Sequence, residues 1–359
     1  MGILSKSCSL SQYTTSTDLP PNFLSKVADK IKYRAFIEIE QDSIKERSVK
    51  ERSVGWVDLY NMLDSSFETV NFLKEPYITL SMRVDKRSIP ASIIKRNCLV
   101  KEQEIMEIEG ITFISGKRKK DIKESAKQSL LSKVLPTTQV YDMVWNYITG
   151  HVLFTNTSTK LCDEFQELFF NTFDLRLNII ELSIVGSVIL SANKKSEEVV
   201  ENFKYLEMPG SDFLTWLWYK YRKDKNEFKI GKNKVRLLFD NRVVLSDEDT
   251  ESPQIVTCVG DSQSMNEIQT ALDDNKIIIQ AKLILTAMSG DYFYFVDSFY
   301  FDFKSIKTPK IQKSKNDDPD AMFYEKIYLI EEAIDILNKI YGEFVLDYSK
   351  KTEKENDKK

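Results

Sequence analysis

The stretch YITLSMRV, residues 77–84, alternates apolar and polar side chains, which is the period of a β-strand whose two faces differ. YDMVWNY, residues 141–147, is a second strand candidate, and a turn at Thr149-Gly150 pairs it with residues 151–155 in a hairpin. The chain between the two strands is helical in pattern. This order of elements predicts a sheet that is interrupted by a helical insertion.

Two helices are predicted within the insertion, residues 86–136. Ser88-Ile89-Pro90 is a helix-start signal, because proline suits the first turn of a helix, and Gly110 stops the pattern. The second helix is predicted over residues 117–134, where apolar side chains recur every fourth residue: Ile122, Ala126, Leu130 and Val134. Two long helices between strands indicate an arm that stands away from the sheet.

The rest of the chain mixes strands and helices. A short helix is predicted near residues 23–31 and a strand over residues 33–40. Residues 235–245 are predicted to form a hairpin that turns at Asp240-Asn241, and a last helix is predicted over residues 320–341. We therefore expect an α+β fold with antiparallel sheets, covering helices, a projecting two-helix tip arm and a second α+β base region.

Four regions are predicted from these patterns. Residues 1–85 and 137–184 form a discontinuous central body, residues 86–136 the tip arm, residues 185–348 the base, and residues 349–359 a disordered charged tail. The N-terminus shows no signal peptide, and no apolar run approaches the roughly 18 residues that a membrane span needs. We expect a cytoplasmic protein without a membrane partner.

The cysteines and the histidine argue against most metal and catalytic sites. The four cysteines are far apart and form no CxxC pair, which favours reduced thiols over a disulfide framework or a zinc site: Cys8, Cys98, Cys162 and Cys258. His151 is the only histidine, which argues against a histidine-based triad or a multi-histidine metal site. A partly exposed strand histidine is the simpler interpretation. The sequence also has no glycine-rich phosphate loop.

One enzymatic alternative stays open. Asp291 followed by Asp302-Phe303-Lys304 resembles the acid and acid-x-lysine pattern with which Mg²⁺-dependent nucleases hold their metal on neighbouring strands. Strand alternation gives Asp302 and Lys304 a common face, but a solvated polar face explains the triplet equally well. We expect no enzyme, no catalytic residues, no bound metal and no cofactor.

Positive charge is concentrated in the arm. Residues 82–136 contain thirteen Lys or Arg against seven Asp or Glu, whereas the rest of the chain contains 38 basic and 48 acidic residues. Lysines recur every four residues along the second arm helix, which suits phosphates without base reading. The predicted DNA-binding residues are Lys117, Arg118, Lys119, Lys120, Lys123 and Lys127, with a second cluster of Arg83, Lys86, Arg87, Lys95 and Arg96. A solvated helix face, or an arm that clasps an acidic protein partner, would explain the same pattern.

An ordered set of segments runs through the chain: Val54-Gly55-Trp56-Val57, KRKKDIKESAKQSLLSKVLP at residues 117–136, Trp145-Asn146-Tyr147-Ile148-Thr149-Gly150, Asp212-Phe213-Leu214-Thr215-Trp216 and residues 281–309. Together they resemble the RdgC family of recombination-associated proteins. No single segment decides the resemblance, which rests on their order and reaches to about residue 310.

The resemblance implies a homodimer that closes into a ring around double-stranded DNA, with a positively lined hole and little sequence preference. The arm would be the tip, its lysines would lie in or near the hole, and the two copies would touch at tip and base. The family restrains RecA-driven recombination, so the resemblance also implies a functional antagonist of RecA in the nucleoid. The family has been described as an exonuclease as well, a role that the residues here do not support.

Overall fold

The structure is a computed structural model that describes residues 2–39, 51–223, 225–247, 253–260, 266–311 and 318–356. The described strands are β1 (Cys8–Thr14), β2 (Arg52–Val57), β3 (Leu73–Lys74), β4 (Tyr77–Lys86), β5 (Thr137–Asn146), β6 (His151–Phe154), β7 (Asn178–Ile179), β8 (Glu227–Ile230), β9 (Asn233–Asp247), β10 (Ile255–Val259), β11 (Lys276–Ala287), β12 (Gly290–Asp297) and β13 (Phe303–Lys307). The described helices are α1 (Phe23–Tyr33), α2 (Ala91–Glu109), α3 (Gly116–Leu131), α4 (Thr159–Phe173), α5 (Leu182–Ala192), α6 (Glu197–Lys204), α7 (Pro209–Arg222), α8 (Asn266–Asp273) and α9 (Pro319–Asn356).

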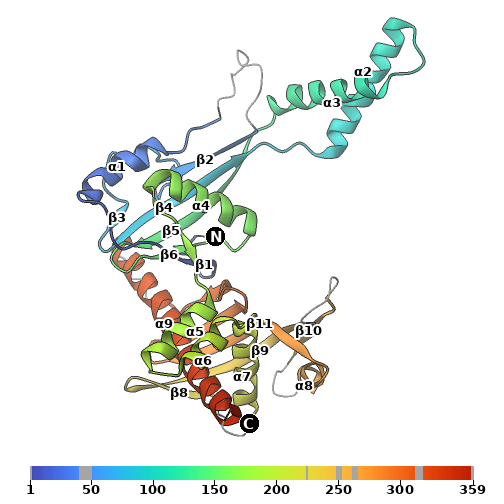
Figure 1. The fold of residues 1–359 in the computed structure, drawn as a ribbon. Helices are drawn as coiled ribbons and strands as arrows, with labels where there is room; N and C mark the ends of the chain where they lie inside the picture. The colour runs from blue at the N-terminus through green and yellow to red at the C-terminus, as the bar shows by residue number, and fades with distance from the viewer. Residues whose placement is uncertain are drawn as a thin grey trace.

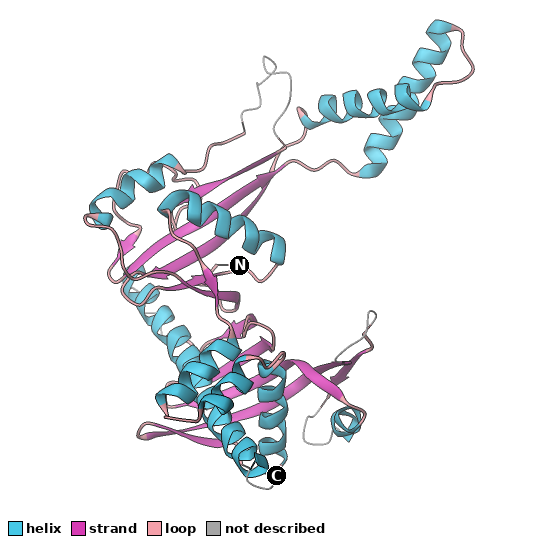
Figure 2. Ribbon diagram, viewed as in Figure 1, coloured by secondary structure: helices cyan, strands magenta, loops and turns pink. Residues whose placement is uncertain are grey.

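The strands join in one antiparallel sheet with the order β10-β9-β11-β12-β13-β1-β6-β5-β4-β2. Figure 2 shows the strands in magenta. The joining strand is β1, whose first half pairs with β13 and whose second half pairs with β6. The predicted α+β class with antiparallel strands is confirmed. The division into body, arm and base stays a prediction.

Helices α1 and α4 cover one face of the upper sheet, β2-β4-β5-β6-β1 (Figure 1). The predicted helix near residue 23 is confirmed, because Phe23, Val27 and Ile31 are buried on α1. The core between helices and sheet is strongly aromatic: Phe154 stacks on Phe165 with ring centroids 4.1 Å apart. Aromatic pairs of this kind bury large apolar areas, so the upper sheet is a firm base for the elements that leave it.

A second core holds the lower part of the molecule together. Helices α5, α7 and α9 pack with strands β9, β11, β12 and β13 around it. Helix α9 is about 57 Å long at 1.5 Å per residue. Its Glu331 accepts a hydrogen bond from Tyr77 Oη of the upper sheet at 2.8 Å, and its Tyr341 Oη donates to the Leu182 carbonyl of the lower part at 2.8 Å. This helix therefore ties the upper sheet to the lower sheet, which is the part β13-β12-β11-β9-β10 of the same strand order.

The two helices of the insertion project from the ends of β4 and β5, at the upper right of Figure 1. Helix α2 ends where predicted, because Gly110 takes the left-handed conformation, with φ of 64°, that glycine adopts readily. Helix α3 ends at Leu131 and is shorter than predicted. Helix α2 buries no residue, while α3 buries Ile122, Ala126 and Leu131. The arm therefore has little core of its own.

Three expectations from the sequence were wrong. Residues 34–39 form only a single bridge, Ala35 to Trp56, because α1 extends to Tyr33; residue 40 lies outside the described residues. Asp240-Asn241 makes no turn, since β9 runs straight through it. The predicted disordered tail is helical to Asn356, where Ser349 is buried and Lys195 pairs with Glu353; residues 357–359 lie outside the described residues.

Candidate nucleic-acid interface

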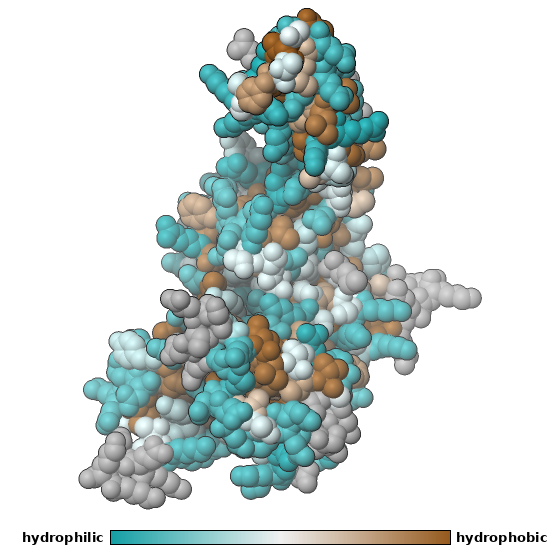
Figure 3. All heavy atoms as spheres, turned by 90° about the vertical axis from the view of Figure 1, so that its right-hand side faces the viewer, coloured by the Kyte–Doolittle hydropathy of each residue, from teal (hydrophilic) through white to brown (hydrophobic). Residues whose placement is uncertain are grey.

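The molecule is concave on one side. The arm extends toward the right of Figure 1 at the top, and β10 and α8 extend to the same side at the bottom. Figure 3 looks onto this side: hydrophilic side chains dominate it, and apolar side chains gather over the arm at the top. A charged rod-shaped ligand would meet the arm and the lower sheet together here.

Half of the predicted cations on α3 already pair with carboxylates. Arg118 forms a two-pronged ion pair with Glu109, whose first contact, Nη1 to Oε2, is 2.6 Å long. Lys119 Nζ lies 3.2 Å from Glu102 Oε2, and Lys127 Nζ lies 2.6 Å from Glu51 Oε1. The pKa of Glu109 is lowered because its carboxylate accepts from the Arg118 guanidinium. Exposed pairs of this kind contribute little to stability and exchange readily for another anion.

The other cations of α3 are exposed. Lys117, Lys120 and Lys123 have no ion pair with any described residue, and they follow one another at intervals of three along the helix. Lys86, Lys95 and Arg96 are exposed as well, at the end of β4 and on α2. Nine of the predicted side chains therefore reach solvent on or beside the arm, which is the geometry that phosphate contacts need.

Two predicted cations are buried, which corrects their assignment to DNA. Arg83 is only 7% exposed; its guanidinium donates to Asp85 at 2.8 and 3.0 Å and to the Met62 carbonyl at 3.2 Å. Arg87 is 2% exposed, and its guanidinium has no hydrogen-bond partner among the described residues. Burial of Arg83 on β4, and of Arg87 directly after it, removes both side chains from any duplex in this conformation.

The end of the arm carries apolar side chains that nothing in this chain covers among the described residues. Ile108 is 83% exposed at the end of α2, and Phe113 is 75% exposed in the turn before α3. Sequence reasoning missed both. The available signal was the presence of these two large apolar residues in an otherwise polar stretch at the end of α2, because exposed apolar side chains that gather on a projecting element often mark contact surfaces.

The predicted nuclease set does not assemble. Asp291 begins β12 and Asp297 ends it, a separation of about 20 Å at 3.3 Å per residue. Asp302 lies at the Asp297 end, where its carbonyl accepts from the Asp297 amide at 3.0 Å. Asp291 instead accepts from Thr286 Oγ1 at 2.8 Å. The first carboxylate is thus too far away to share a metal ion with Asp302.

A different trio does come together. Asp297, Asp302 and Lys304 line a pocket of about 270 Å³ between β1, α4 and the β12–β13 turn, with Lys304 Nζ 3.7 Å from Asp297 Oδ2. Ser11 Oγ donates to Asp302 at 3.0 Å, and burial raises the pKa of Asp302 to about 6. Among the described residues no three carboxylate, cysteine or histidine side chains gather as they would around a metal ion. The trio can hold a proton or an internal ion pair.

One family model matches the chain, over residues 31–205, and its description is "Putative exonuclease, RdgC". Over these residues the chain is similar to the RdgC family. The resemblance seen in the sequence is confirmed, and the match includes strands β2, β4, β5 and β6 of the upper sheet and the whole arm, but not β1. Similarity to the RdgC family indicates a recombination-associated, DNA-binding protein. A search of curated proteins found no match to the chain.

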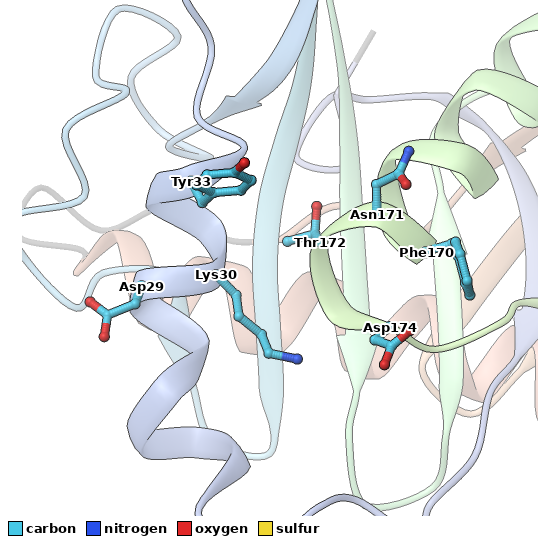
Figure 4. A pocket seen from close by; sticks show the side chains of 7 residues that line it. All are labelled: Asp29, Lys30, Tyr33, Phe170, Asn171, Thr172 and Asp174. Carbon is cyan, nitrogen blue, oxygen red and sulfur yellow. The ribbon is translucent and has the colours of Figure 1, made fainter.

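Two further features of the chain bear on its site. The groove between α1 and α4 is lined by Lys30, Tyr33 and Thr172 among others (Figure 4), but Lys30 Nζ donates to the Phe173 carbonyl and Thr172 Oγ1 donates to the Leu168 carbonyl. The Lys30 bond joins the two helices, whereas the Thr172 bond lies within α4, so both polar groups are already engaged. No helix in the described ranges has the length and apolar character to cross a bilayer.

Proposed function

We propose that this protein binds double-stranded DNA through its phosphates, without sequence preference and without catalysis. The observation that carries the proposal is the row of exposed lysines on α3 that have no ion pair with a described residue: Lys117, Lys120 and Lys123. Lysine ammonium groups on a helix meet phosphates as point charges and read no bases. The three paired cations beside them supply a second set that a duplex can recruit.

The active form in this proposal is a homodimer closed into a ring around the duplex. The concave side of one copy would face that of its partner (Figure 1), and the exposed Ile108 and Phe113 would meet a second arm. The lower ends would provide the other contact. By occupying the duplex in this way, the protein would restrain RecA-dependent recombination in the nucleoid.

Absence of catalysis is part of the proposal, and the trio of Asp297, Asp302 and Lys304 is the competing candidate. Support for a binding role comes from the geometry, because Lys304 Nζ lies 3.7 Å from Asp297 and no three carboxylate, cysteine or histidine side chains of the described residues gather as they would around a metal ion. Incubation of an end-labelled duplex with Mg²⁺ or Mn²⁺ separates the two. Cleavage that disappears in Asp302→Asn would replace the binding role by a nuclease.

The salt dependence of binding tests the phosphate contacts. Each phosphate that a lysine neutralises adds about 0.9 to the slope of log affinity against log salt. The variant K117A/K120A/K123A should therefore lower the slope by up to about 2.7 on any duplex. Anisotropy of a labelled duplex, measured with two unrelated sequences over a salt series, gives the slope directly.

A matched control removes the same charge elsewhere. Lys26, Lys32 and Lys160 are exposed lysines on α1 and α4 of the body, so K26A/K32A/K160A changes the net charge equally. The control should keep most of the slope. Equal losses in both variants would mean that the duplex feels only the overall charge, and the arm would then be a solvated surface.

A further inference from the structure

A second potential binding site lies away from the arm. It is a pocket of about 680 Å³ between the N-terminal residues, the β12–β13 pair and the start of α9. The first turns of α9 lie at the left of Figure 1, whereas the arm projects to the right. The volume falls in the range of small-molecule sites, roughly 300 to 1,000 Å³.

The walls of this pocket are mainly apolar. Leu4, Phe293, Pro309, Ile311 and Met322 line it, and Leu4 and Phe293 are exposed to it rather than packed in the core. Apolar walls in contact with water are unfavourable, so an apolar ligand group gains free energy by displacing the water from them.

Lys326 on α9 is the unusual group in the pocket. It is 4% exposed, and its ammonium donates to Thr308 Oγ1 at 2.8 Å. No carboxylate of the described residues lies within ion-pair distance of it. An ammonium group has three donors, so one hydroxyl leaves it undersatisfied. A buried, unpaired positive charge is costly, and burial accordingly lowers the pKa of Lys326.

The remaining charge around the pocket is also positive. Lys6, Lys307 and Lys310 line it and are exposed, against one acid, Asp291, which already accepts from Thr286. A ligand that combines an anionic group with an apolar body would satisfy both the ammonium and the walls.

We propose that this pocket binds one amphipathic anion, with a carboxylate or phosphate head on Lys326 and Thr308 and an apolar chain against Leu4, Phe293 and Met322. This inference is independent of DNA binding. A free carboxylate and a phosphate monoester share the required chemistry, so both are used as probes.

Isothermal titration with decanoate and with decyl phosphate, below their micelle concentrations, tests the site. We expect one molecule to bind per chain and at least tenfold tighter than decanol or decyltrimethylammonium, which lack the anionic head. Tighter binding of decyl phosphate would identify a phosphate source, and tighter binding of decanoate a carboxylate source. Equal binding of decanol would overturn the proposal, because the ammonium would then contribute nothing.

Variants locate the ligand. Lys326→Met keeps the apolar stem and removes the charge, and it should weaken decanoate at least tenfold. Lys339→Met, on the exposed side of the same helix, should leave binding unchanged. Should Lys326→Met fold poorly by circular dichroism, the exposed pair K307E/K310E provides a second test and should weaken binding several-fold.

Competition distinguishes this site from the DNA surface. A saturating duplex should leave decanoate affinity unchanged. Displacement of decanoate by the duplex, or full binding in both lysine variants, would show that the pocket is not a separate anion site.

Discussion

Releasing the paired cations of the arm should strengthen DNA binding. The variant E51Q/E102Q/E109Q removes the carboxylates that hold Lys127, Lys119 and Arg118 while it keeps side-chain size. In the native protein a duplex must break these pairs before the cations can contact phosphates. In the variant they are available from the start, so more of them should take part in binding.

The magnitude follows from the number of pairs. Three additional phosphate contacts raise the salt slope by up to about 2.7, at about 0.9 each. Between about 0.1 M and about 0.2 M salt, the variant should then lose about sixfold more affinity than the native protein loses. At low salt it should bind more tightly than the native protein.

Anisotropy titrations over a salt series, beside a control of equal charge, give the answer. Glu104, Glu107 and Asp121 are exposed acids on the same two helices with no ion pair to a described residue, so E104Q/E107Q/D121N adds the same charge and frees no cation. The reasoning fails if the two variants show the same slope. In that case the gain comes from the long-range field, and the paired cations do not contact DNA.

Three other predictions test separate parts of the structure. Burial raises the pKa of Asp302 from 3.8 to about 6, so its contribution to the free energy of unfolding is full below about pH 4 and falls as the pH rises to 6. Urea unfolding should show that Asp302→Asn removes this fall in the free energy of unfolding, which is up to about 3 kcal/mol. An unchanged pH profile in the variant would contradict the assignment. A Cβ on Gly210 would lie 1.9 Å from the Ser298 carbonyl oxygen, whereas one on Gly116 meets nothing within 4 Å, so Gly210→Ala should cost about 1–3 kcal/mol in thermal or urea unfolding and Gly116→Ala should cost nothing. Sedimentation should show that I108D/F113D weakens self-association at least tenfold while I37D/Y205D, at equally exposed sites outside the arm, does not; equal behaviour of the two would remove the tip from the dimer contact.

The elements with one apolar face could be predicted from the sequence. Helix α1 is defined by apolar residues at a four-residue spacing, namely Phe23, Val27 and Ile31. Helix α2 of the insertion begins after Pro90 and ends before Gly110, which are start and stop signals visible in the sequence. Local signals suffice there because each is enforced by geometry, namely the fixed φ of proline and the left-handed conformation open to glycine. Helical spacing also placed these lysines on α3, but the row predicted at four-residue intervals was Lys119, Lys123 and Lys127, of which Lys119 and Lys127 pair with acids.

Features that depend on distant chain segments could not be predicted. The alternation of β4 implied a polar, solvated face, yet Ser81 and Arg83 are buried there. Asp142 accepts from Ser81 Oγ at 2.8 Å and from the Ile3 amide at 2.7 Å, so the N-terminal residues cover the polar face. The cover comes from more than 130 positions away in the sequence, counted from Ile3 to Asp142. Arg83 on the same strand is engaged by other segments, with its guanidinium 4.2 Å from the Phe36 ring centroid and donating to the Met62 carbonyl. Local period therefore cannot reveal that Arg83 is unavailable to DNA.

The turn signal at Asp240-Asn241 shows a related limit. These residues favour turns because their side chains tolerate unusual backbone angles, and β9 uses them within a strand. Pairing of β9 with β11 shifts register between Ala281 and Leu283, opposite this segment, which is the signature of a β-bulge. The same local preference serves a hairpin or a bulge, and the neighbouring strand decides between them.

The acids on the arm explain how a net-acidic protein can carry a basic arm that stays apart from its own body. Glu102 and Glu109 on α2 neutralise Lys119 and Arg118 on α3, and Glu51 beside β2 neutralises Lys127 at the root of the arm. Unpaired, these cations would repel one another along a helix pair that has little core to resist it. Pairing holds α2 against α3 in the absence of DNA, and phosphates can take over the cations because exposed pairs are weak. The carboxylates would then hold the arm together when it is free, and the phosphates that replace them would set the salt dependence of DNA binding. The variant E51Q/E102Q/E109Q separates these two roles, because it removes the carboxylates and keeps the cations.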